Sequence, residues 1–165
     1  MQRHFTVTGF VSADGKTALH WHKFGMWLPP GGHIEADEDP VQATLREVLE
    51  ETGLEVELVP SEAPFRYQSP PQLPPPATIG VFEIPSDGSL KELHEHIDMV
   101  YFTRPRSLAL PETDGWRWVD AATLRDNVAL TPPSGGDPVS IADDVRELGL
   151  AAIAAVGGPP IRPGC

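Results

Sequence analysis

Three glutamates, Glu47, Glu50 and Glu51, are spaced so that a helix would bring their carboxylates onto one patch. Like charges at this spacing destabilise a helix unless something neutralises them. Carboxylate oxygens suit a hard divalent cation, so we expect the three glutamates to bind Mg²⁺, with Mn²⁺ as an alternative. For any single glutamate the more common interpretation is a solvated acidic helix face.

The residues before this helix fit the same chemistry. Gly31 and Gly32 permit a sharp turn, and a backbone carbonyl of either glycine would add a metal ligand. Arg46 directly precedes the first of the three carboxylates. We expect its guanidinium group to bind Glu38 or Glu35 and to hold the loop against the helix.

Together these residues resemble the Nudix box of the MutT-like hydrolases. That motif is Gly, five residues, Glu, seven residues, Arg-Glu-apolar, any residue, Glu-Glu, any residue, Gly-apolar. Residues 32–54 match every fixed position, with Gly32, Glu38, Arg46-Glu47-Val48, Glu50-Glu51 and Gly53-Leu54. The predicted order of elements is also similar to a Nudix domain over nearly the whole chain.

The resemblance implies an enzyme that hydrolyses a diphosphate bond in a substrate linked to a nucleoside diphosphate. It implies an α/β/α sandwich around a mixed β-sheet. The box glutamates would be the metal ligands together with a glycine carbonyl, and Glu38 and Arg46 would orient the box. The general base varies within the family. Our candidate is Glu112, six residues before Trp118, with Asp114 as the alternative; an ordinary loop carboxylate is an equal interpretation of Glu112.

Other residues are candidates for substrate binding. Lys23 could meet a phosphate and Trp27 could stack on a nucleobase, although a tryptophan in a strand more often belongs to the core. His94, His96 and Asp98 alternate, so they share one strand face. We expect that face to line the cleft; a separate transition-metal site and a plain exposed face are the alternatives. The acidic pair from the loop, Glu35 and Glu38, completes the candidates.

The predicted elements place the box between strands. Asp39 as N-cap and Pro40 after it predict a helix that runs to Thr52 and stops at Gly53. Its apolar side would comprise Val41, Leu45, Val48 and Leu49. Alternating and apolar stretches predict strands over residues 5–11, 17–22, 27–28, 34–35, 54–59, 79–84, 97–103 and 116–119.

Two further helices are predicted, a short one from Asp120 and a C-terminal one over residues 138–155. Residues 60–78 hold seven prolines and predict a long surface loop. This pattern favours an α+β class with a mixed sheet. We expect one domain over residues 1–156 and a flexible tail over 157–165.

Composition limits the partners. The 165 residues carry 12 Lys and Arg against 24 Asp and Glu, a net charge of -12, which argues against a polynucleotide partner and weakens an RNA 5′-end pyrophosphatase. No apolar run approaches a membrane span or a signal peptide core, so we expect a cytoplasmic protein without a membrane partner. A homodimer is an open alternative without an interface signature.

Three functional hypotheses follow. The first is a Mg²⁺-dependent pyrophosphohydrolase whose substrate is a nucleoside triphosphate or an oxidised nucleotide. Alternative substrates are ADP-ribose, a nucleotide sugar, a dinucleoside polyphosphate or a non-nucleotide diphosphate. The second is a Nudix module that senses a nucleotide without cleaving it, and the retained glutamates make it the weaker one. The third is the RNA pyrophosphatase.

Overall fold

The computed structural model describes residues 1–86, 91–107 and 115–157. Three helices are present in this part of the chain, α1 (Pro40–Thr52), α2 (Ala121–Arg125) and α3 (Asp143–Gly157). The strands are β1 (Arg3–Ala13), β2 (Lys16–His22), β3 (Met26–Leu28), β4 (Gly31–His33), β5 (Val56–Leu58), β6 (Thr78–Ile84), β7 (His94–Pro105) and β8 (Trp116–Asp120).

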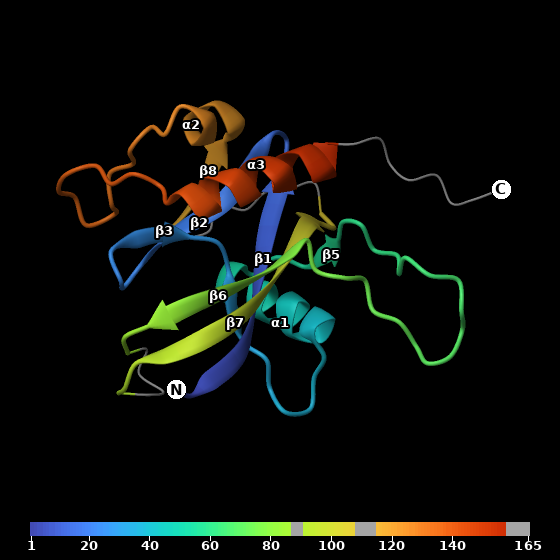
Figure 1. Cartoon of the computed structure of the whole chain (residues 1–165). Coiled ribbons are helices and arrows are strands. Elements are labelled where there is room, and N and C mark those ends of the chain that lie inside the picture. The colour runs from blue at the N-terminus through green and yellow to red at the C-terminus, as the bar shows by residue number, and fades with distance from the viewer. Residues whose placement is uncertain (87–90, 108–114, 158–165) are drawn as a thin grey trace.

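The strands form a mixed sheet centred on β1 (Figure 1). The strand order is β3-β2-β1-β7-β5, with β4 also paired to β1, β6 to β7 and β8 to β2. β1 and β7 run parallel over nine residue pairs, from Arg3 beside Glu95 to Val11 beside Thr103. The other named strand pairs are antiparallel. The predicted α+β class and mixed sheet are confirmed.

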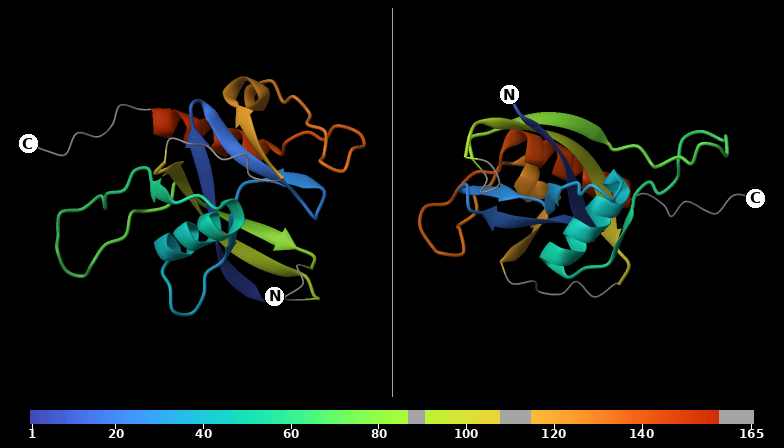
Figure 2. Two further views of the ribbon diagram at one scale, coloured as in Figure 1. Left: turned by 180° about the vertical axis from the view of Figure 1, so that it is seen from behind. Right: turned by 90° about the horizontal axis from the view of Figure 1, so that it is seen from below.

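Two consecutive residues of β1 show how helices cover both faces of the sheet. Gly9 lies under α1, where a Cβ atom would stand 2.7 Å from Cγ2 of Val48. Phe10 points the other way and packs with Val145 and Ala152 of α3. Since neighbouring side chains of a strand point to opposite faces, α1 and α3 lie on opposite sides of β1 (Figures 1 and 2). This is the predicted α/β/α sandwich.

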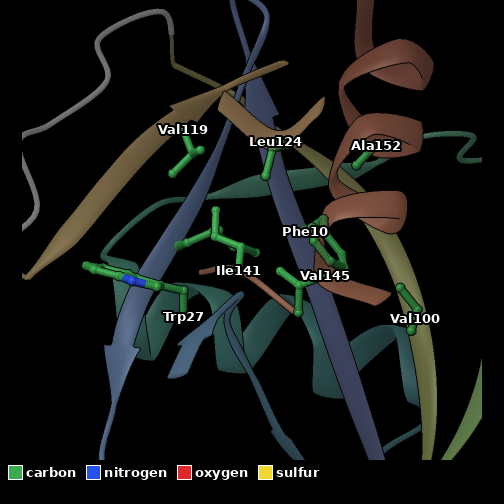
Figure 3. Close-up of a cluster of buried hydrophobic side chains, with 9 residues drawn as sticks. Phe10, Trp27, Val100, Val119, Leu124, Ile141, Val145 and Ala152 are labelled. Carbon is green, nitrogen blue, oxygen red and sulfur yellow. The ribbon is translucent and has the colours of Figure 1, made fainter. Parts of the chain in front are cut away.

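The larger hydrophobic cluster lies on the α3 side (Figure 3). Trp27 belongs to it and has no accessible surface. In the β2–β3 ladder Trp27 pairs with Trp21, and the two ring centroids lie 5.3 Å apart. The expectation that Trp27 stacks on a nucleobase is therefore wrong, because its ring is enclosed by core side chains.

Helix α1 has the predicted bounds, and its buried side is only partly the predicted one: Val48 is buried and Leu45 packs against the core. Asp39 caps it by accepting hydrogen bonds from the backbone of Val41 and Gln42, and Gly53 ends it in the left-handed conformation. Leu49 is 46% exposed, whereas Thr44 and Thr52 are buried. The threonine hydroxyls donate to the carbonyls one turn earlier, 2.7 Å and 2.6 Å away, which removes the cost of burying them.

Other boundaries differ from the prediction. The short strand after the prolines is Gly31–His33 rather than residues 34–35, because pairing with β1 defines it. β7 begins at His94, three residues earlier than predicted, and α3 begins at Asp143 rather than residue 138. Residues 158–165 of the predicted tail, and Glu112 and Asp114, lie outside the described residues. Within the described ranges no helix is both long and apolar enough to cross a membrane.

Candidate active site

The Glu47 carboxylate packs directly on the backbone of Gly32. A Cβ atom on residue 32 would stand 2.4 Å from both Cδ and Oε1 of Glu47. Gly32 is fixed in β4 by its pairing with Val7, and Glu47 is fixed on α1. Any larger residue at position 32 would therefore displace this carboxylate.

Arg46 holds the box together. Its Nε donates to Glu38 Oε2 at 3.0 Å, and Nη2 donates to the other Glu38 oxygen and, at 3.0 Å, to the His33 carbonyl. Its Nη1 donates to Glu47 Oε1 at 2.7 Å and to Glu50 Oε2 at 3.3 Å. One guanidinium group thus joins the loop, the end of β4 and two of the three box carboxylates.

Of the two loop glutamates, Glu38 has a positioning role in the structure. Both Glu38 oxygens are engaged, because Oε1 also accepts the Glu35 backbone N–H at 2.9 Å. The Arg46 hydrogen bonds hold the pKa of Glu38 below its ordinary value. The predicted contact of Arg46 with Glu38 is present. The expectation that Glu38 touches substrate is not supported, since its carboxylate is turned into the protein; Glu35 is exposed.

The two glycine carbonyls are not equivalent. The bonds from Gly9 N–H to Pro30 and from Ile34 N–H to Phe5 mark the paired positions of the β1–β4 ladder. Hydrogen-bonded and non-hydrogen-bonded residue pairs alternate in an antiparallel ladder. The backbone of Gly32 is therefore hydrogen-bonded to Val7, whereas the N–H and carbonyl of Gly31 point away from β1. Consistently, the Gly31 backbone hydrogen-bonds Glu51. This bond lowers the pKa of the Glu51 carboxyl group, so the Gly31 N–H donates it. Of the two glycines, Gly31 is the one whose backbone is directed away from β1.

The electrostatics of Glu51 fit a divalent cation. Desolvation of its carboxyl group raises the pKa to about 7, with further repulsion from Glu47 and Glu50, while the Gly31 backbone hydrogen bond opposes the shift. The atoms of Glu47, Glu50 and Glu51 that could bind a metal ion are all carboxylate oxygens, the ligand type that Mg²⁺ and Mn²⁺ prefer. A divalent cation beside these groups would favour the ionised form of Glu51.

Sequence reasoning missed an aromatic pair beside the box helix. Trp116 of β8 donates its Nε1–H to the Glu51 carbonyl at 3.1 Å. Its ring lies 4.5 Å from that of His20, its partner across the β2–β8 ladder. Burial and then the charge of His22 lower the pKa of His20 to about 4, so this imidazole is neutral at pH 7. Only the strand pairing could have revealed this contact.

The remaining predicted substrate residues lie elsewhere. Lys23 is exposed in the turn between β2 and β3, with Nζ 5.5 Å from the centre of the Phe24 ring. His94 has no accessible surface, and Asp98 is 6% exposed and accepts the Thr6 hydroxyl at 2.7 Å. Burial raises the pKa of Asp98, and hydrogen bonds from Thr6 and Thr8 oppose the shift. The prediction that His94 and Asp98 line an open cleft is therefore not supported; His96 is half-buried.

Comparison with known proteins fits this geometry. A family model described as NUDIX domain matches residues 2–135. The chain belongs to the NUDIX family. A hydrolase of this family from Clostridium perfringens has a similar structure, with a TM-score of 0.66 and 25% identity over 94% of this chain and 99% of that one. A UDP-X diphosphatase matches in fold, with a TM-score of 0.50 and 13% identity over 94% of this chain and 63% of that one.

Two NUDIX relatives are similar in sequence. The m7GpppN-mRNA hydrolase NUDT17 of Danio rerio is 39% identical over 107 residues, which cover 61% of this chain and 33% of that protein. The RNA pyrophosphohydrolase of Dinoroseobacter shibae is 33% identical over 108 residues, which cover 62% of this chain and 64% of that protein. The chain thus spans less than two thirds of the length of either curated relative.

Proposed function

We propose that this chain hydrolyses a diphosphate bond in a nucleotide with the help of Mg²⁺, or of Mn²⁺ in its place. The observation that carries the proposal is the Arg46 guanidinium group, which holds Glu47 and Glu50 beside Glu51 and against the Gly31-Gly32 backbone. Arranged in this way, the three carboxylates form an oxygen-rich site on a rigid helix.

Each residue of the box has a role in this proposal. Glu47, Glu50 and Glu51 hold the cation together with the Gly31 carbonyl. Arg46 and Glu38 are positioning residues, because they bind each other and the helix carboxylates. When bound, the cation would neutralise negative charge on the diphosphate oxygens and lower the pKa of a bound water molecule. Glu112 remains the proposed general base on sequence grounds alone.

For the nucleoside part we propose the aromatic pair of His20 and Trp116. The pair adjoins the C-terminal end of α1 through the Trp116 hydrogen bond to Glu51. A half-buried indole next to a neutral imidazole offers a flat surface on which a base can stack. This pair replaces Trp27, which the core encloses.

A nucleoside triphosphate or an oxidised nucleotide is the first proposed substrate. The alternatives are ADP-ribose, a nucleotide sugar and a dinucleoside polyphosphate. The names of the two sequence relatives favour a second candidate, the phosphorylated or capped 5′ end of an RNA. The net charge of -12 opposes long contacts with the phosphate backbone of an RNA. This second candidate therefore requires that the chain recognises only the terminal nucleotides.

The decisive experiment is phosphate release from a substrate panel with Mg²⁺, with and without a coupled phosphatase and a coupled pyrophosphatase. The panel contains nucleoside triphosphates, oxidised nucleotides, ADP-ribose, nucleotide sugars, dinucleoside polyphosphates and a short 5′-triphosphate RNA. Pyrophosphate from a triphosphate supports the first substrate, and faster release from the RNA than from any free nucleotide supports the second. Binding of a nucleotide without cleavage of any panel member would contradict the enzymatic proposal.

A further inference from the structure

Four of the six histidines gather at one end of the sheet, although they come from three separate strands. His4 of β1 and His96 of β7 are direct partners in the parallel ladder. The His94 and His96 rings lie 5.0 Å apart, those of His4 and His94 lie 5.3 Å apart, and those of His33 and His96 lie 4.9 Å apart. We call these four residues the histidine cluster.

The histidine cluster and the box carboxylates lie on opposite faces of the sheet. Gly32 faces Glu47, so its neighbour His33 faces the other way. His33 is paired with Thr6, which shares the face of His4. One contact between the two groups runs through the backbone, where the His33 carbonyl accepts a hydrogen bond from the Arg46 guanidinium. The histidine cluster is therefore separate from the proposed diphosphate site.

The hydrogen bonds of His94 determine which of its nitrogens can act as a ligand. His94 Nδ1 lies 2.9 Å from the Glu92 carbonyl, and a carbonyl oxygen only accepts, so Nδ1–H donates. In the neutral ring the lone pair is then on Nε2. A ring N–H that donates to a backbone carbonyl is the usual support of a metal-binding histidine. His94 is fully buried, so this orientation is fixed by packing.

The spacing of the nitrogens fits a common metal ion. Nε2 of His94 and Nε2 of His96 lie 3.2 Å apart and are hydrogen-bonded, with His96 as the donor. Metal binding requires the proton of this bond to move to Nδ1 of His96, which leaves both Nε2 atoms as ligands. Two ligands of a tetrahedral zinc ion, with bonds of about 2.0–2.1 Å, lie roughly 3.3 Å from each other. A nitrogen of His4 completes the group, and the three ligand atoms all lie within 4.8 Å of one another. His4 is half-buried beside exposed residues, so its ring has room to approach.

We propose that His4, His94 and His96 form a binding site for a late first-row divalent metal ion such as Zn²⁺. His33 is a positioning residue of this site, because its Nε2 lies 3.1 Å from Nδ1 of His4. Three imidazoles without a carboxylate suit Zn²⁺, Ni²⁺ or Cu²⁺ and disfavour Mg²⁺. Asp98 shares the strand face but does not belong to the group whose ligand atoms all lie within 4.8 Å of one another, so it is not counted as a ligand. The ion would join the starts of β1 and β7.

The test measures Zn²⁺ affinity by competition with a chromophoric chelator, on metal-free protein that carries Glu50→Gln and Glu51→Gln. These changes remove two of the three box carboxylates, so failure of the hydrolase proposal and failure of the metal site are distinguishable. We expect one Zn²⁺ per chain, unaffected by an excess of Mg²⁺. X-ray absorption of the zinc complex should show nitrogen ligands at about 2.0–2.1 Å.

Single substitutions assign the ligands. In the same background, His4→Gln or His96→Gln should weaken Zn²⁺ binding at least 100-fold. Loss of a residue that only supports a ligand costs up to about 100-fold in metal affinity, and loss of a ligand itself should cost no less. His33→Gln should weaken it by about 10–100-fold as a positioning residue. His22→Gln is the matched control, because this histidine lies in β2 outside the cluster, and its affinity should be unchanged. Circular dichroism confirms that each variant is folded.

Two outcomes overturn the proposal. One is Zn²⁺ binding that His4→Gln and His96→Gln leave within a few-fold of the parent protein. The other is saturation only at millimolar Zn²⁺ in a protein that is folded. Because His4 is half-buried, His4→Gln remains an informative variant even if a change at the buried His94 prevents folding.

Discussion

The carboxylate of Glu47 occupies the space that a side chain on Gly32 would need, with 2.4 Å between the Cβ position of residue 32 and Oε1 of Glu47. The glycine of the box is thus required by this contact rather than by a left-handed backbone conformation. A Gly32→Ala substitution should push Glu47 off the site and lower kcat by at least tenfold, about 1.4 kcal/mol of transition-state stabilisation. Steady-state kinetics with Mg²⁺ would measure it. Gly157→Ala is the control, since nothing lies within 4 Å of its added Cβ, and equal losses in both variants would contradict this role.

The raised pKa of Glu51 makes the metal-free protein sensitive to pH. Its pKa rises from 4.5 to about 7 on folding, so the folded state binds this proton more tightly than the unfolded state. The free energy of unfolding should therefore fall as pH rises from about 4.5 to about 7 and contribute no further change above that. Urea unfolding in a chelator at pH 5, 6, 7 and 8 would measure the slope. Glu51→Gln should reduce it; the same slope in both proteins would contradict the assignment.

The same proton should compete with the cation. Below pH 7 Mg²⁺ must displace the proton from Glu51, so Mg²⁺ affinity should increase as pH rises from 6 to 8. Isothermal titration calorimetry in buffers of different ionisation enthalpy would count the protons released. A pH-independent affinity with no proton release would show that Glu51 is not at the metal site.

The five hydrogen bonds that Arg46 donates predict that lysine cannot replace it. A lysine ammonium is a point charge and cannot reach both Glu38 oxygens, the His33 carbonyl and two carboxylates together. Arg46→Lys should lower stability by roughly 1–3 kcal/mol, the range for hydrogen bonds to charged groups. A double-mutant cycle with Glu38→Gln should show coupling between the two sites. If the effects of the two substitutions on the free energy of unfolding are additive, the Arg46–Glu38 contact does not contribute to stability.

Trp27 and Trp116 should respond differently to substitution. Trp27→Ala empties a fully buried core position and should cost about 3–5 kcal/mol of stability. Trp116→Leu removes the ring that lies against His20 and the hydrogen bond to Glu51, so it should raise KM for the nucleotide by about tenfold or more. Thermal unfolding and steady-state kinetics separate the two effects. A KM change in Trp27→Ala larger than in Trp116→Leu would overturn the proposed base-stacking surface.

The general base stays a prediction from the sequence. Glu112→Gln should lower kcat by about a hundredfold or more if this carboxylate takes the proton from water. Asp114→Asn is the matched comparison, because it tests the alternative base in the same segment. A loss of less than tenfold in Glu112→Gln would remove this residue from the mechanism.

The sequence alone predicted the box and its helix, because both are local. Asp39, Pro40 and Gly53 mark the helix ends through short-range capping, and the helical repeat alone brings Glu47, Glu50 and Glu51 together. Strand positions followed from alternation, with errors where pairing decides the bounds, as at Gly31–His33. The sequence did not predict that Thr44 is buried, because its hydroxyl finds a hydrogen-bond acceptor, the Pro40 carbonyl, only once the helix has formed.

The tertiary structure decided which residues of distant segments meet. The register of β2 with β3 puts Trp27 in the core, and its register with β8 puts His20 beside Trp116 at the box helix. The parallel pairing of β1 with β7 brings His4 to His94 and His96 across more than 85 residues of sequence. No local pattern encodes these contacts, since a shift of one residue in any of these three ladders would turn the side chains of the shifted strand to the opposite face.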